Sequence, residues 1–319
     1  MRAIAIETHC FQPRCEISMT LTEARKQFLR HCGSAISLSP HTMRAYCSDL
    51  DDTLSYFGLR KKLESVEKDH LRQYIRHLRE HRRFKETTIK RRLASLKLLF
   101  KWAMQEEFIK TNPFDSLNER IRLPKRLPRA LDRGDQATLR KAVAIQSRTD
   151  NFDIVRGKTA IHLLLDTGIR VGELVAINLN DLSLANGCLV INGKGNRQRL
   201  VYLLQKPLYR KIEQYLTRRN SVSTCTEKLF VTSGGSAIST PNVRVVLRDI
   251  AKKAGIAKHV TPHMLRHTCA TQWLESGLDI RYVQKLLGHH SISTTEIYTH
   301  VSDQGLREAL ARAGGRKKR

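Results

Sequence analysis

The β-forming residues of this chain are concentrated in one short part of it, and this limits the possible folds more than any other feature. Residues 188–191 and 199–203 are rich in Val, Leu, Ile and Tyr and predict two short strands. The segment between them, Asn192-Gly-Lys-Gly-Asn196, predicts the turn of a hairpin. An apolar run at 229–232 could add one further strand. We therefore expect a mainly α protein with a small antiparallel β-sheet.

Residues 20–118 carry apolar side chains at helical spacing in four segments. These segments begin near Thr22, at Pro40, near Lys68 and near Ile89, and proline suits the first position of a helix. The fourth segment repeats apolar residues every three or four positions, at Ile89, Leu93, Leu96, Phe100 and Ala103. Four such helices without a strand signal predict an N-terminal helical bundle.

A basic segment with two prolines, residues 123–131, predicts a linker between two domains, because proline interrupts helices. The domain after it is expected to be mostly helical and to contain the hairpin. The predicted division is an N-terminal extension (1–18), a helical domain (19–122), the linker (123–131), a second domain (132–313) and a basic tail (314–319).

The chain carries 57 Lys and Arg residues against 30 Asp and Glu, which gives a formal net charge of +27. The first 125 residues hold 25 basic and 15 acidic side chains, and the remainder holds 32 and 15. Both parts are basic, so a charged tail does not explain the total. This balance predicts a polyanionic partner, nucleic acid first and an anionic membrane surface second.

No apolar run approaches the ~20 residues that span a bilayer, which excludes an integral membrane protein. Residues 1–18 are polar where a secretion signal would need an apolar core. The seven cysteines are scattered and form no CxxC pair, so we expect reduced thiols rather than disulfides or a zinc module. These features predict a cytoplasmic protein.

Basic residues crowd the segment 79–92, at Arg79, Arg82, Arg83, Lys85, Lys90, Arg91 and Arg92. Such a run is usually a solvated helix face. The alternative is contact with the phosphates of a duplex, which its position beside a helix start favours. The sequence leaves both interpretations open.

Four polar clusters stand out in the second domain, and the first is Asp166-Thr-Gly-Ile-Arg170, followed by Glu173. Gly168 is expected to end one helix and Arg170 to open the next. A cation at a helix start opposes the helix dipole, so this placement predicts a bound anion. A surface arginine paired with Glu173 is the alternative.

The second cluster is Lys194, which has glycine on both sides at the tip of the predicted hairpin. Flanking glycines allow the backbone to approach a ligand closely. Taken alone, a loop lysine that serves solubility is the simpler interpretation.

The third cluster is Thr261-Pro-His-Met-Leu-Arg-His267. Thr261 is expected to cap a helix, and His263 and Arg266 then lie on one face of it. A histidine and an arginine at one point suit proton transfer beside a phosphate. Plain packing is one alternative. A zinc helix is another, because His263 and His267 have its spacing, but Met264 stands where a metalloprotease needs Glu.

The fourth cluster is Gly288-His289-His290, followed by Tyr298. Residues 279–287 predict a helix that Gly288 ends. Ser293 and Glu296 have capping-box spacing, which places Tyr298 in the first turns of a short helix. A tyrosine there is ordinarily a core or hydrogen-bonded residue, so by itself it indicates no function.

Together, the ordered motifs Thr-Gly-Ile-Arg-x-x-Glu-Leu, Gly-Lys-Gly, His-x-Leu-Arg-His and Leu-Gly-His, with a tyrosine nine residues on, resemble the tyrosine recombinase (phage integrase) family, of the Xer type. The resemblance covers most of the chain. It implies a site-specific DNA recombinase that cuts and rejoins duplex DNA without metal, cofactor or ATP. The helical domain 19–122 would be its core-binding domain, and 132–313 its catalytic domain.

The resemblance also implies roles for individual residues. Tyr298 would be the nucleophile that holds DNA as a 3′-phosphotyrosine, and Glu173 would orient Arg170. Six residues would form the catalytic set: Arg170, Lys194, His263, Arg266, His289 and Tyr298. The two arginines would clamp the phosphate oxygens, because planar bidentate donors suit that task. Lys194 would protonate the leaving oxygen, His263 would act as acid or base, and His289 would hold a phosphate oxygen.

The implied partner is double-stranded DNA, bound at paired sites by a homo-tetramer or by a hetero-tetramer with a related recombinase. Residues 301–313 could supply a helix that docks on a neighbouring protomer. The expected location is the cytoplasm, at the nucleoid. Two alternatives remain: a type IB topoisomerase-like relaxing enzyme, and a non-catalytic DNA-binding regulator on the same scaffold.

Overall fold

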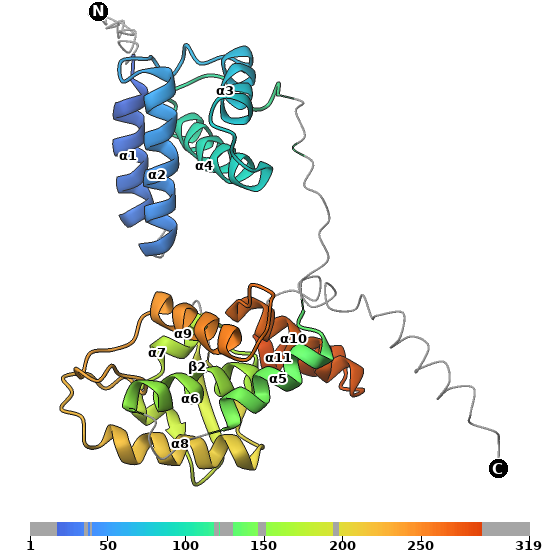
Figure 1. Ribbon diagram of the computed structural model, residues 1–319. Coiled ribbons are helices and arrows are strands. Elements are labelled where there is room, and N and C mark those ends of the chain that lie inside the picture. The colour runs from blue at the N-terminus through green and yellow to red at the C-terminus, as the bar shows by residue number, and fades with distance from the viewer. Residues whose placement is uncertain are drawn as a thin grey trace, which may run out of the picture. The chain divides into compact units, whose positions relative to one another are not determined.

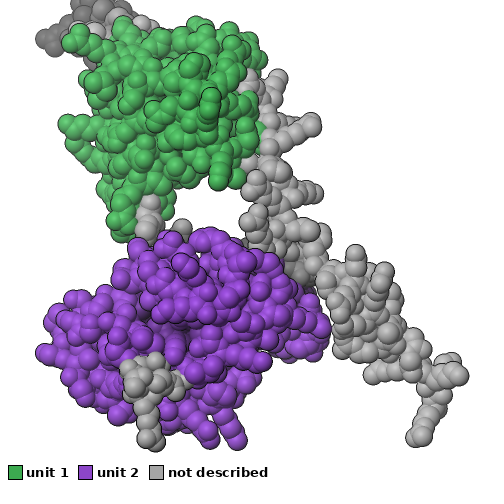
Figure 2. Space-filling model, viewed as in Figure 1, with its two compact units in different colours: residues 1–125 green, residues 126–319 purple. Residues whose placement is uncertain are grey.

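The computed structural model describes residues 18–34, 38, 40–117, 121, 130–145, 151–193 and 198–288. Several sequence predictions concern residues outside these ranges: Lys194, His289, Tyr298, the helix at 301–313, the basic tail and most of the linker. The chain divides into two compact units, residues 1–125 and 126–319 (Figure 2). Each unit is described by itself.

Unit 1 contains the four predicted helices (Figure 1). Their bounds are α1 Leu21–Ser34, α2 Pro40–Phe57, α3 Lys68–Glu80 and α4 Glu86–Gln105. The apolar stripe of α4 is buried as its periodicity predicts, with Ile89, Leu96, Phe100 and Ala103 at 0 % exposure. In α3, Tyr74 is equally buried, and its hydroxyl lies 3.1 Å from the hydroxyl of Thr53 in α2. The helical bundle is confirmed.

Part of the basic run in unit 1 has a structural role. Arg92 is 8 % exposed, pairs with Asp52 at 2.6 Å and lies 4.5 Å from the ring centre of Phe84. Ion pairs also engage three others: Arg79 with Glu86, Arg82 with Asp52 and Arg91 with Asp49. Arg83, Lys85 and Lys90 are exposed, and within the described residues no ion pair involves them. The run therefore divides into four arginines that form ion pairs, of which only Arg92 is buried, and three exposed residues without an ion pair to another described residue.

Unit 2 is built around α6 Phe152–Thr167, whose residues are buried on nearly all sides. It packs against α5 Arg133–Ala144, α8 Lys206–Arg219, α9 Thr240–Lys253 and α10 Pro262–Glu275. A helix that is buried on nearly all sides needs such a shell. The other described helices of this unit are the short α7 Val171–Ala176 and α11 Ile280–Leu287, with a 3₁₀ turn at Leu179–Asp181.

The sheet is antiparallel and has the order β1-β2-β3. Its strands are β1 Leu182–Ser183, β2 Cys188–Asn192 and β3 Gln198–Tyr202. The predicted hairpin is therefore confirmed, with Leu189 opposite Val201. The two-residue strand β1 gives no sequence signal, because two residues are too few for an alternating pattern.

The strand predicted at 229–232 is wrong. Within the described residues this segment makes only an isolated bridge, between Val231 and Ala237, and does not join the sheet. Leu229 and Phe230 are buried in the core. The carbonyl of Leu229 accepts hydrogen bonds from the side chains of Tyr215 and Arg219 instead of from a neighbouring strand. The apolar run reflects burial, which an irregular segment also provides.

Among the described residues, no helix has the length and apolar character needed to cross a membrane.

Candidate active site

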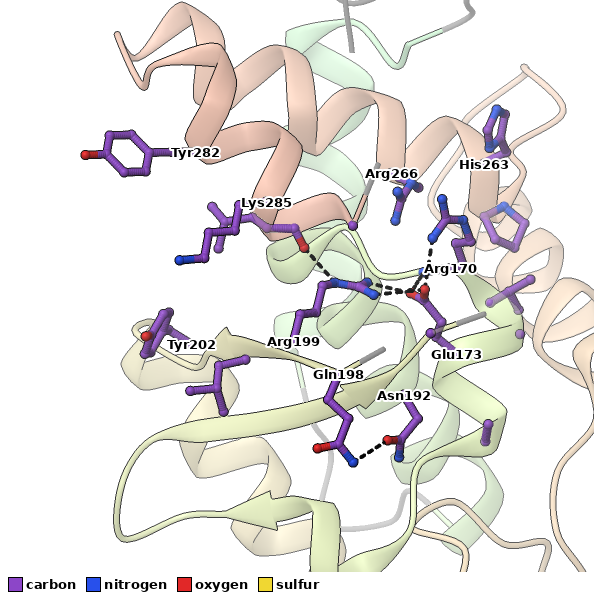
Figure 3. Close-up of a pocket in the computed structure, with 18 of the residues that line it drawn as sticks. Arg170, Glu173, Asn192, Gln198, Arg199, Tyr202, His263, Arg266, Tyr282 and Lys285 are labelled. Atoms are coloured by element: carbon purple, nitrogen blue, oxygen red, sulfur yellow. Dashed lines mark hydrogen bonds and ion pairs between the residues drawn. The ribbon is translucent and has the colours of Figure 1, made fainter. Parts of the chain in front are cut away.

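A cleft of about 1720 Å³ opens in unit 2 between α7, the hairpin, α10 and α11 (Figure 3). Three predicted site residues line it: Arg170, His263 and Arg266. Its described lining contains five Arg or Lys side chains against one acid, Glu173. Positive charge thus gathers in a concave site, which favours a polyanionic ligand.

Arg170 lies where α6 ends and α7 begins. Gly168 ends α6 in the left-handed conformation with φ 61°, which glycine adopts without strain, and Arg170 is the N-cap of α7. These positions confirm the helix boundaries predicted at both residues. Just before this turn, the buried carboxylate of Asp166 pairs with Arg140. The ion pair of Asp166 with Arg140 therefore anchors the end of α6 just before the turn, and Arg170 lines the cleft.

Arg170 also forms the ion pair with Glu173 that the alternative interpretation of this residue predicts. Its Nη1 lies 3.0 Å from Glu173 Oε1, and its backbone N–H donates to Oε2 at 2.8 Å. The Arg170 side chain is nevertheless 48 % exposed, whereas that of Glu173 is 8 % exposed. The pair therefore fixes the arginine without burying it, and anion contact and pairing are compatible.

Arg266 is almost completely buried, with 2 % exposure. Its Nη1 donates to the carbonyl of Gly168 at 2.8 Å, and its Nη2 donates to the carbonyl of Leu287 at 2.7 Å. Both carbonyls belong to helix C-termini, where the partial charge is negative and a cation is stabilised. These two bonds set the orientation of the guanidinium in the cleft wall.

His263 is exposed on the first turn of α10 and lines the cleft beside Arg170 and Arg266 (Figure 3). The predicted cap is confirmed: Thr261 Oγ1 accepts from the backbone N–H of Met264 at 3.3 Å. His267, the other member of the zinc alternative, is 7 % exposed. Within the described ranges, no group of three or more His, Cys, Asp or Glu side chains could hold a metal ion.

Glu173 is the acidic centre of the cleft wall. Burial alone would raise the pKa of its carboxyl, but hydrogen bonds from Arg199 and from the backbone of Arg170 outweigh burial and lower the pKa below its ordinary value. The carboxylate is therefore ionised when it faces the two guanidinium groups.

Sequence reasoning missed Arg199. It lies on β3 and donates from both terminal nitrogens to the carboxylate of Glu173, at 3.0 and 2.7 Å (Figure 3). One available signal was the alternation of the strand, since Arg199 shares the inward face of β3 with buried Val201. An arginine at an inward strand position needs a buried acceptor, and the acceptor here lies 26 residues earlier.

Lys194, His289 and Tyr298 lie outside the described residues. Gly193, which precedes Lys194, and Gly288, which precedes His289, line the cleft. Gly288 ends α11 with φ 67°, as the sequence predicts.

A mainly helical unit whose cleft presents arginines and a histidine is the kind of site that handles a phosphodiester. Two family models match the chain: the phage integrase family over residues 137–305, and the phage integrase N-terminal SAM-like domain over residues 26–107. Among curated relatives, tyrosine recombinase XerC of Thermodesulfovibrio yellowstonii is 36 % identical over 279 residues, covering 86 % of this chain and 90 % of the relative. Tyrosine recombinase XerD of Halalkalibacterium halodurans is 32 % identical over 300 residues, covering 92 % and 97 %.

Solved structures agree with these matches. The XerA recombinase is 29 % identical, with a TM-score of 0.53 and coverage of 94 % of this chain and 100 % of that one. The XerH recombinase bound to a palindromic difH substrate shares the fold, at 24 % identity, with a TM-score of 0.72 and coverage of 90 % and 84 %. The chain belongs to the phage integrase family, the tyrosine recombinases. More narrowly, it is an Xer-like, tyrosine-type site-specific recombinase that cleaves and rejoins DNA.

Proposed function

We propose that this recombinase cleaves DNA with the hydroxyl of Tyr298. The phenolic oxygen attacks the scissile phosphorus, the new P–O bond makes a 3′-phosphotyrosine, and the bond to the 5′ oxygen breaks. The phenol loses a proton and the leaving oxygen gains one, so a 5′ hydroxyl departs. The phosphodiester is retained in the covalent intermediate, so rejoining needs no ATP.

Arg170 and Arg266 form the phosphate clamp in this proposal. The observation that carries it is that both arginines and His263 line one cleft, although Arg170 precedes the other two by more than 90 residues in the sequence. Negative charge grows on the non-bridging oxygens as the phosphorus is attacked, and preorganised guanidinium groups stabilise it. The hydrogen bonds of Arg266 to two carbonyls, and of Arg170 to Glu173, supply that preorganisation.

The proton transfers fall to the remaining predicted residues. His263 acts as acid or base, and its exposure at the cleft beside the clamp supports this role. Lys194 protonates the departing 5′ oxygen, and His289 holds a phosphate oxygen. Their roles rest on the sequence motifs, and the lining of the cleft by Gly193 and Gly288 supports them.

The test is a nicked suicide substrate, from which the strand fragment carrying the 5′ hydroxyl diffuses away and traps the covalent complex. Wild-type protein should give a protein–DNA adduct that survives denaturation, and Tyr298→Phe should bind the DNA without forming it. Adduct formation by Tyr298→Phe would assign another nucleophile.

The same assays separate the two alternative functions. Relaxation of supercoiled DNA by the wild-type protein, without a joint product between two sites, would favour the topoisomerase alternative. DNA binding by the wild-type protein without any covalent adduct would favour the regulator.

We further propose that four protomers act on paired DNA sites in the cytoplasm, at the nucleoid, either as one protein or together with a related recombinase. The basic charge of both parts of the chain supports the DNA contact. Light scattering on a two-site DNA complex tests the stoichiometry. Four protomers per pair of sites support the proposal, and two protomers contradict it.

A further inference from the structure

Arg199 connects three elements of the cleft wall. It lies on β3, and its Nη1 and Nη2 donate to the two carboxylate oxygens of Glu173 on α7 at 3.0 and 2.7 Å. Its Nε donates to the carbonyl of Leu286, in the last turn of α11, at 2.8 Å. Its side chain is 12 % exposed, so these three bonds lie largely away from water.

Through Glu173, this arginine reaches the predicted clamp. The same carboxylate accepts from the Nη1 and the backbone N–H of Arg170. A bidentate arginine–carboxylate pair fixes the plane of both groups, and a carboxylate held in this way presents fixed acceptors to its other partner. The orientation of Arg170 thus depends on where Arg199 holds Glu173.

A second connection runs through the end of α11. Arg199 donates a hydrogen bond to the carbonyl of Leu286, and Arg266 donates one to the next carbonyl, that of Leu287. Arg266 also binds the carbonyl of Gly168, two residues before Arg170. The bonds therefore close a circuit from Arg170 through Glu173, Arg199, α11 and Arg266 back to the turn that carries Arg170.

Gly288 lies against the side chain of Arg199. A Cβ at position 288 would lie 3.0 Å from Nη1 and 3.2 Å from Cδ of Arg199, closer than ordinary van der Waals contact. The positive φ of 67° adds a second reason for glycine. Glycine at 288 therefore leaves room for the Arg199 side chain.

We propose that Arg199 is a positioning residue for DNA cleavage, which holds Arg170 through Glu173 and aligns the end of α11 with Arg266. This inference rests on the proposed clamp function of Arg170 and Arg266. Lysine cannot replace this arginine, because one ammonium cannot supply a planar fork to the carboxylate and a third bond to Leu286. The role differs from that of the clamp in that Arg199 acts through Glu173 rather than on the phosphate.

The experiment compares Arg199→Lys and Arg199→Met with wild type in single-turnover cleavage of the suicide substrate at saturating protein. Cleavage should slow by about 10- to 100-fold, by analogy with the loss of a residue that orients a metal ligand through a hydrogen bond. The DNA dissociation constant should change by less than about twofold. Arg210→Met, which removes an exposed arginine of α8 outside the cleft lining, is the charge-matched control and should cleave as wild type does.

A substrate with a methylphosphonate at the scissile position separates positioning from general structural damage. This group lacks one anionic oxygen, so the clamp has less charge to stabilise. The defect of the Arg199 variants should shrink on it, as that of Arg170→Ala should. A defect of equal size on both substrates, or parallel losses of cleavage and DNA binding, would assign Arg199 to folding alone and overturn the proposal.

Two further variants cover the case in which Arg199→Met does not fold. Gly288→Ala keeps the arginine but crowds it, and Glu173→Gln keeps the shape but removes the charge. Slow cleavage with normal DNA binding in folded Arg199→Lys or Gly288→Ala supports the proposal, and wild-type rates in both overturn it. If Arg170→Ala itself cleaves at the wild-type rate, the clamp is wrong. If the Arg199 variants cleave at the wild-type rate and Arg170→Ala does not, the clamp stands and the positioning role fails.

Discussion

Arg266 donates a 2.8 Å hydrogen bond to the carbonyl of Gly168, and so joins α10 to the turn that presents Arg170. These residues lie 98 positions apart in the sequence. The bond means that one arginine of the proposed clamp holds the backbone beside the other. The geometry of the proposed clamp and the stability of unit 2 are therefore linked at this point.

Arg266→Lys should impair both cleavage and stability. A lysine has one nitrogen in place of the two that donate to the carbonyls of Gly168 and Leu287, and we expect one of these acceptors to be left unsatisfied, which lowers the free energy of unfolding by about 1–3 kcal/mol. Cleavage of the suicide substrate should fall by at least about 100-fold, because a clamp donor is removed. Urea unfolding and single-turnover cleavage measure the two effects. Arg133→Lys, at a 67 % exposed side chain, is the matched control, and an unchanged cleavage rate in Arg266→Lys would contradict the clamp.

Gly168→Ala should destabilise the protein, whereas Gly33→Ala should not. At Gly168 an alanine would adopt φ 61°, and its Cβ would lie 3.0 Å from Leu287 and 3.3 Å from Cys269. Left-handed strain alone amounts to about 1–2 kcal/mol. Gly33 lies in α1, where a Cβ meets nothing within 4 Å and alanine favours the helix. Thermal unfolding of the two variants should shift in opposite directions, and equal shifts would argue against strain at Gly168.

Glu173→Gln should reduce the sensitivity of the protein to acid. The lowered pKa of Glu173 in the folded state means that its contribution to stability is complete above the ordinary value of 4.5 and is lost as pH falls through the lower folded pKa. Wild type should therefore exceed the variant in unfolding free energy at pH 7, and the difference should shrink below about pH 4.5. Urea titrations at several pH values measure this. Glu80→Gln, at an exposed position of α3, controls for charge alone, and a difference that grows in acid would refute this role of Glu173.

Lys85→Ala and Lys90→Ala should weaken DNA binding, whereas Arg92→Ala should mainly weaken folding. The two lysines are exposed near the start of α4, and removing one lysine–phosphate ion pair should lower the slope of log affinity against log salt by about 0.9. Arg92 is buried against Asp52 and Phe84. Fluorescence anisotropy over a salt series and thermal unfolding separate the effects. An unchanged salt slope in the double lysine variant would favour the solvated-face interpretation of this run.

Cleavage should survive EDTA. The proposed charge stabilisation comes from guanidinium groups of the chain, and arginine stays protonated in proteins. Covalent adduct formed with and without chelator, at equal ionic strength, should be equal within error. Loss of the adduct in EDTA, restored by added zinc, would revive the alternative in which His263 and His267 bind a metal.

Helix positions followed from the sequence because their signals are local. The apolar stripe of α4, the Thr261-Pro262 start of α10 and the glycine ends at Gly168 and Gly288 each depend on residues within a few positions. The extra strand at 229–232 was predicted wrongly because an apolar run reports burial and not its hydrogen-bond partners. The side chains that donate to the carbonyl of Leu229 come from α8, and no local pattern indicates them.

The candidate site divides along the same line. The motifs indicated Arg170, His263 and Arg266 from their residue types and order, and the capping signals placed them at helix starts. That Arg266 joins two helix ends, and that Arg199 completes the circuit through Glu173, was decided only by the tertiary structure. Local chemistry determines which residues can carry charge to a phosphate. Packing of distant segments determines which carbonyls hold Arg266 and which guanidinium holds Glu173, since these partners lie 21 to 98 residues apart in the chain.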